Sequence, residues 1–97
     1  MTIEVTDAPE ASRFEIHEGG AILGFAEYRL QPGRIVFPHT EVDPAVGGRG
    51  LGTTLIRGAL DTARARSLQV VPLCSFVAAF IRNHPDYADL VAADSDD

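Results

Sequence analysis

The chain has 97 residues, the size of one domain, and a domain this small buries only about 60–65% of the surface that its unfolded chain exposes, so any chemistry takes place on a single core. The net charge is −6 and the eight basic residues are scattered arginines, which argues against a nucleic-acid-binding surface. No apolar run is long enough to span a membrane, the N-terminus does not read as a signal peptide, and a single cysteine permits no internal disulfide, so a cytoplasmic location is the default expectation.

The first part of the chain predicts two antiparallel strands. Residues 1–12 show no clear periodicity, so we expect a loose lead-in there. From Arg13 onward, apolar Phe14 and Ile16 alternate with polar neighbours, which predicts a strand that ends at a glycine-containing hairpin turn. Residues 21–30 are rich in apolar and aromatic side chains and predict the returning strand.

A longer strand, Arg34–Val42, is predicted after a turn at residues 31–33. Pro38 lies inside it and cannot donate a ladder hydrogen bond, which predicts a bulge or an unpaired edge. His39 and Glu41 are two residues apart and therefore share one face of the strand, provided that the bulge does not separate them.

Four glycines in six residues follow this strand, at Gly47, Gly48, Gly50 and Gly52. Glycine permits positive φ and close approach of a ligand, and a helix after the loop adds free N–H groups and the positive end of its dipole. An anion site is therefore predicted, although such clusters also occur as ordinary loops. A Walker-type loop and a dinucleotide fingerprint are excluded, because Thr53 stands where lysine or the third glycine would be.

An amphipathic helix is predicted over residues 51–66, with its apolar side chains on one stripe. Gly58 within it costs up to about 1 kcal/mol relative to alanine, so we expect close packing against a strand. Residues 68–73 predict a short buried strand, parallel to the strand before the helix by the right-handed crossover rule. Two short helices and an acidic disordered tail complete the expected elements, at residues 76–82, 86–91 and 92–97.

The segment from strand to helix resembles the acetyl-CoA loop of GNAT-type N-acetyltransferases. Their pattern Val-x-Pro-x-x-(Arg/Gln)-x-x-Gly-x-(Gly/Ala) matches here from Val42 to Gly52 at every anchor but one. The departure is Gly47, where the family usually has Arg or Gln, so backbone amides and Arg49 must carry more of the pyrophosphate contact. Three further segments resemble the very small members of the family, at residues 39–42, 71–74 and 83–87, within a resemblance that covers residues 14–91.

This resemblance implies an α/β fold with a mixed (α+β) sheet of GNAT-like core type, in one acetyl-CoA-binding domain over residues 13–91. Antiparallel strands would lead into one β-α-β unit whose parallel strands splay to admit the pantetheine arm, and one or two helices would follow. No metal site is expected. The expected cofactor-binding residues are Val42, Gly47, Gly48, Arg49, Gly50, Leu51, Gly52, Thr53, Cys74, Asn83 and His84.

Transfer of acetyl to an amine needs a base and a site for the thioester. Glu41 and His39 are the candidate bases, and their alternatives are a rim carboxylate and a hydrogen-bonded sheet residue. Cys74 follows the second parallel strand, where the resemblance places the thioester. It could accept the acetyl group, donate to the leaving thiolate, or be inert packing.

Many larger relatives have a tyrosine that protonates the leaving thiolate at the place where this chain has Phe80. The difference implies slow transfer, a substitute donor such as Cys74 or His84, or a protein that binds CoA without rapid turnover. Two functions are therefore expected. One is acetyl transfer to a small-molecule or peptide amine by a monomer or weak dimer, and the acidic charge mildly favours a cationic acceptor. The other is a non-catalytic CoA-binding module that regulates a partner.

Overall fold

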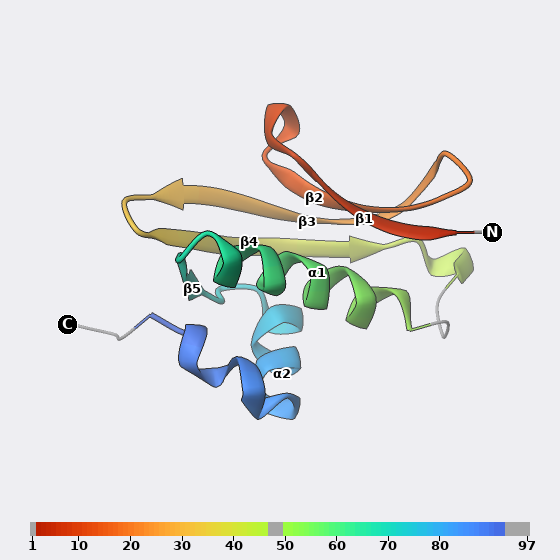
Figure 1. The fold of residues 1–97 in the computed structure, drawn as a ribbon. Coiled ribbons are helices and arrows are strands. Elements are labelled where there is room, and N and C mark those ends of the chain that lie inside the picture. Colours follow the sequence, from red (N-terminus) through yellow and green to blue (C-terminus); the bar gives the residue numbers. More distant parts are fainter. Residues whose placement is uncertain (1, 47–49, 93–97) are drawn as a thin grey trace.

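The computed structural model describes residues 2–46 and 50–92, and this part of the chain contains one five-stranded sheet with the strands in sequence order (Figure 1). The first four strands are antiparallel, and the last two are parallel. This mixed sheet confirms the predicted fold class. The strands are β1 (Ile3–Ala8), β2 (Arg13–Glu18), β3 (Ala21–Gln31), β4 (Arg34–Val42) and β5 (Gln69–Val71).

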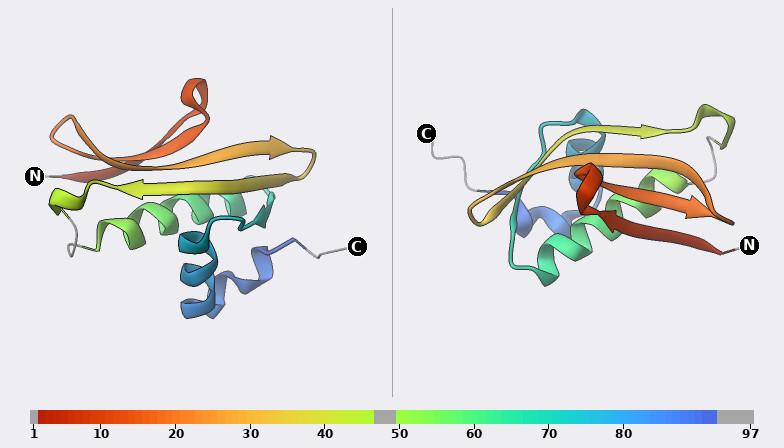
Figure 2. Two further views of the ribbon diagram at one scale, coloured as in Figure 1. Left: turned by 180° about the vertical axis from the view of Figure 1, so that it is seen from behind. Right: turned by 90° about the horizontal axis from the view of Figure 1, so that it is seen from above.

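The helices lie on one side of the sheet, and the opposite face is open, as both views in Figure 2 show. Helix α1 (Leu51–Ala65) joins β4 to β5 and completes the predicted β-α-β unit. Helix α2 (Ser75–Asn83) follows β5. None of the helices in the two described ranges is long and apolar enough to cross a membrane. The described residues also contain three short 3₁₀ segments: η1 (Pro9–Ala11), η2 (Pro44–Val46) and η3 (Pro85–Leu90).

The expectation that residues 1–12 form no regular element is wrong. Strand β1 pairs with β2 through six residues, and Ile3 and Val5 pack against the core on its inner face. The alternation of apolar and polar residues in β1 covers only a few positions, and a carboxylate interrupts the apolar series on the inner face. That carboxylate, Asp7, accepts a hydrogen bond of 2.7 Å from the buried Tyr28 hydroxyl, which offsets the cost of placing a charge there.

The core is formed by the inner face of the sheet and the apolar stripe of α1. All six predicted stripe positions are buried, so the helical period in the sequence located this face correctly. The buried residues of α1 are Leu51, Leu55, Ile56, Ala59, Leu60 and Ala63.

A bulge in β4 confirms the interruption predicted at Pro38. Glu27 of β3 faces His39, and Arg29 faces Val36, so two steps along β3 oppose three steps along β4. The extra residue reverses the alternation of β4, because each further side chain then points to the opposite face.

Strands β4 and β5 separate just beyond this bulge. Their ladder ends at Val36 and Val71, and one further bond of 2.8 Å runs from the Cys74 N–H to the Phe37 carbonyl. β5 is shorter than predicted because the chain turns after Val71, where the Leu73 N–H donates back to the Val71 carbonyl at 3.1 Å. The separation corresponds to the splayed pair expected from the resemblance.

The described chain ends beside β5. The Ala92 N–H donates to the Val70 carbonyl at 2.8 Å, and Val91 bridges to Val70 in parallel. Of the predicted tail at residues 92–97, only Ala92 lies within the described residues.

Gly58 lies where α1 packs on β1, which confirms the expected reason for a glycine inside the helix. A Cβ at this position would lie 2.8 Å from Val5 Cγ1.

We expect Gly58→Ala to lower the free energy of unfolding by about 1–2 kcal/mol, because overpacking typically costs more than the gain of up to about 1 kcal/mol in helix propensity. Urea denaturation measures this change. The control is Gly58→Ala combined with Val5→Ala, which should cost less than the sum of the two single changes. Additive effects would show that the Val5 contact is not the cause.

Candidate functional site

Helix α1 begins with backbone N–H groups that donate to no capping side chain at its N-cap residue, within the part of the chain that the structure describes. Its N-cap, Gly50, has φ 73° and carries no side chain, and no acidic residue stands in the first turn. The positive end of the helix dipole is therefore uncompensated there, as at anion-binding helix ends. Gly47, Gly48 and Arg49 were also expected at this site and lie outside the described residues.

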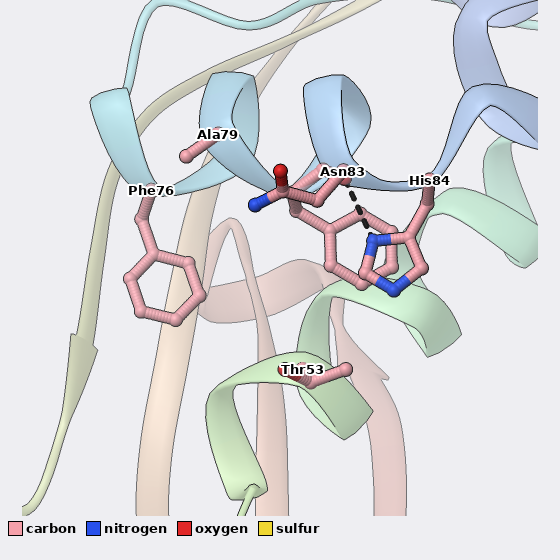
Figure 3. A pocket seen from close by; sticks show the side chains of 6 residues that line it. Thr53, Phe76, Ala79, Asn83 and His84 are labelled. Atoms are coloured by element: carbon pink, nitrogen blue, oxygen red, sulfur yellow. Dashed lines mark hydrogen bonds between the residues drawn. The ribbon is translucent and has the colours of Figure 1, made fainter.

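Two cavities adjoin this helix end and together form a groove. The first, about 240 Å³, lies between β4, η2 and the starts of α1 and α2. The second, about 200 Å³, extends along α2 to its end. Thr53 and Phe76 line both cavities. The first is lined by Val42, Val46, Gly50, Leu51, Gly52, Thr53 and Phe76, and the second by Thr53, Phe76, Ala79, Phe80, Asn83 and His84 (Figure 3).

Gly52 packs directly against the ring of Phe76. A Cβ at this position would overlap Cζ of Phe76, whose side chain is 41% exposed between the two cavities. Phe76 was not predicted as a site residue, because only the folded chain brings α2 over the start of α1. Leu51, an expected cofactor-binding residue, has its side chain in the core and offers mainly backbone to a ligand.

His84 holds a defined orientation at the far end of the groove. Its ring stacks on Phe80 with centroids 4.0 Å apart, and Nδ1 lies 2.8 Å from the Phe80 carbonyl oxygen (Figure 3). A carbonyl oxygen only accepts, so Nδ1 carries the hydrogen and Nε2 is the acceptor in the neutral ring. His84 is one helix length from Cys74, roughly 14 Å at 1.5 Å per residue. It is therefore too far away to donate a proton to a thiolate beside Cys74.

Cys74 lies at the separated edge of β4, as predicted, and is the N-cap of α2. Its thiol donates to the Thr40 hydroxyl oxygen at 3.5 Å. Burial alone would raise the pKa of this thiol, but hydrogen bonding by Thr40 and by the backbone of Val77 and Phe76 outweighs it, so that the pKa is lowered. Sequence reasoning missed Thr40. Its position between His39 and Glu41 was the available signal, since alternation places it on their opposite face.

His39 and Glu41 form a hydrogen-bonded pair on the open face of the sheet. His39 Nε2 and Glu41 Oε2 are 2.7 Å apart, and both side chains are about half exposed or more, at 49% and 61%. A carboxylate only accepts, so Nε2 carries a hydrogen, and in the neutral ring Nδ1 is then the acceptor. The bulge therefore does not separate the two residues. Cys74, in contrast, contacts β4 from the helix side through Thr40.

The comparisons with known proteins agree on one family. The family model described as GCN5-related N-acetyltransferase matches residues 13–90. A GCN5-like protein from Staphylococcus aureus, solved by NMR, has 24% sequence identity and a TM-score of 0.71 over 95% of this chain and 90% of that chain. The ribosomal-protein-alanine N-acetyltransferase of Brucella melitensis biovar Abortus has 21% identity and a TM-score of 0.56 over 88% of this chain and 64% of that chain. No curated protein sequence matches.

We expect Thr40→Val to raise the pKa of Cys74, because valine keeps the shape of threonine but removes the hydroxyl that favours the thiolate. The rate of alkylation by iodoacetamide, measured against pH, should then rise at higher pH than in the unmodified protein. Thr62→Val is the control, since that hydroxyl donates to the Gly58 carbonyl within α1. Coincident pH profiles for all three proteins would contradict the assignment.

Proposed function

Because the chain belongs to the GCN5-related N-acetyltransferase family, we propose that it binds acetyl-CoA and transfers the acetyl group to a primary amine. The observation that carries this proposal is the separated edge of β4. The groove from the start of α1 reaches that edge at Val42, and the His39–Glu41 pair and the Cys74 thiol flank it from opposite faces.

The groove suits a long ligand with a phosphate group. The uncapped N–H groups of Gly50 to Thr53, together with Arg49, would hold the pyrophosphate. The backbone of β4 beyond Phe37, which β5 does not pair, would bind the pantetheine amides. Asn83 and His84 in the second cavity would contact the nucleotide end. When bound, acetyl-CoA supplies the activated acetyl group.

The proton of the attacking amine goes to the His39–Glu41 pair. Glu41 accepts from His39 Nε2 and thereby leaves the Nδ1 lone pair free as the base. This arrangement assigns His39 the proton transfer and Glu41 its orientation. The second oxygen of Glu41 is the alternative base, since that side chain is 61% exposed.

We favour direct transfer over an acetyl-cysteine intermediate. The side-chain partner of the Cys74 thiol is the neutral hydroxyl of Thr40, which cannot serve as a strong base. The lowered pKa of this thiol would serve a donor to the leaving thiolate and a nucleophile alike, so the preference rests on the Thr40 partner.

One observation favours the alternative of a non-catalytic CoA-binding module. Phe80 is buried between His84 and Tyr87, with ring centroids 4.0 Å and 5.5 Å away, and carries no hydroxyl for proton donation. Tyr87 does not replace it, because its hydroxyl donates to Asp61 at 2.6 Å.

We expect calorimetry to detect CoA binding. Gly50→Asp should weaken this binding about tenfold or more, because two like charges about 4 Å apart repel by roughly 1–4 kcal/mol. Gly50→Asn is the matched control, since asparagine has the same shape, tolerates positive φ and carries no charge. It should weaken binding far less. Absence of heat at millimolar CoA would rule out the cofactor proposal.

We expect the protein to release thiol from acetyl-CoA when a primary amine is added, and His39→Gln to slow this by about 100-fold or more, as expected for loss of a general base. Colorimetric thiol detection measures the rate. A protein that binds CoA by calorimetry yet releases no thiol above background, over a panel of amines and basic peptides, would instead be the binding module.

Cys74→Ala should keep most of this activity if transfer is direct. Mass spectrometry after brief exposure to acetyl-CoA should then find no acetyl group on the peptide that contains Cys74. The chain has no lysine, so the N-terminal amine is the main competing acceptor within the protein. A stoichiometric Cys74 adduct that decays when amine is added would reverse this preference.

A further inference from the structure

A third cavity, about 300 Å³, lies on the open face of the sheet, away from the helices. It is bounded by the β2–β3 hairpin on one side and by the end of β4 on the other. Neither the family nor the proposed cofactor groove accounts for it. Its lining residues are Arg13, Ile22, Leu23, Gly24, Phe25, Glu41, Val42, Asp43 and Pro44.

The walls combine apolar surface with carboxylates. Phe25 and the 47% exposed Ile22 supply apolar contact, and Glu41 and Asp43 are exposed carboxylates at its edge. Asp43 accepts a hydrogen bond of 2.9 Å from the Ala45 N–H through Oδ1, which orients its carboxylate.

The ring of Phe25 already has a cation against one face. The Arg13 guanidinium lies 4.6 Å from the ring centroid, and its Nε donates to Glu15 at 2.7 Å. Glu15 therefore balances the charge of Arg13. Glu41 and Asp43 leave the remainder of the cavity net negative, and an aromatic face beside carboxylates is the chemistry that binds organic ammonium ions.

This cavity also adjoins the separated edge of β4. Val42 lines both the cavity and the first cavity of the cofactor groove. Glu41 lines the cavity as well and is hydrogen-bonded to His39. A molecule in this cavity is therefore next to Glu41, the hydrogen-bond partner of His39.

On the premise of the acetyl transfer proposed above, we propose that this cavity is the acceptor site and that it takes a primary ammonium ion on a small apolar body. Phe25 and Ile22 would contact the body, and Glu41 and Asp43 would attract the ammonium group. An acceptor with its own carboxylate next to the amine would meet like charge at this edge and bind poorly.

The test of binding uses benzyltrimethylammonium, which has the proposed chemistry but no N–H to acetylate. In an NMR titration of the ¹⁵N-labelled protein without acetyl-CoA, we expect shifts concentrated at Ile22, Phe25 and Asp43. Asp43→Asn should weaken this binding about twofold to fivefold, the usual scale for an exposed charge pair, and it keeps the oxygen that accepts from Ala45. Glu10→Gln removes the same charge outside the cavity and should change nothing.

The test of transfer compares three acceptors in the thiol-release assay. We expect phenethylamine to have a lower KM than ethanolamine, which lacks the apolar body, and than phenylalanine, which adds a carboxylate. Absence of shifts at millimolar probe, or shifts elsewhere on the protein, overturns the site. Equal KM values for the three amines overturn the substrate class while leaving acetyl transfer intact. Probe binding in the cavity without thiol release from any amine would retain the ammonium site but remove the proposed transfer.

Discussion

The arrangement of the site depends on one extra residue in β4, at the bulge beside Pro38. Before the bulge, Ile35 and Phe37 point into the core. In a regular strand His39 and Glu41 would continue on that same inner face, and Thr40 would face solvent. The bulge reverses this order. It directs the imidazole and the carboxylate outward and turns the Thr40 hydroxyl toward Cys74.

The same position ends the pairing of β4 with β5. The chain after Val71 turns away to start α2, as the bond from the Leu73 N–H back to the Val71 carbonyl shows, so β5 does not continue beside β4 past Phe37. β4 consequently presents functional groups on both of its faces and along one edge. One face offers a proton acceptor, the other contacts a thiol, and its free edge offers backbone groups.

The sequence predicted the elements with strong periodicity. Arg34–Val42 was correct to the residue, and the apolar stripe of α1 was correct at every position. β1 was missed because its alternation is short and includes Asp7, a carboxylate on the inner face that is stabilised by the Tyr28 hydroxyl and by an ion pair with Arg66.

For the site, spacing along β4 was enough to place His39 and Glu41 together. Their separation from Cys74 on opposite faces was not predicted, because it depends on how β5 and α2 bring Cys74 against Thr40. The position of Phe76 in the groove and the third cavity, which Phe25 lines, could not be predicted either, because each forms between elements that are distant in the chain.

The contact between Gly52 and Phe76 has a consequence for how such sequences diverge. The loop pattern of the family permits either glycine or alanine at the position of Gly52, and here the ring of Phe76 leaves no space for a methyl group. An alanine there would require the ring of Phe76, a side chain on another helix, to move. Related chains with alanine in the loop should carry a smaller residue at the start of the second helix, so that the two positions change together over evolutionary time.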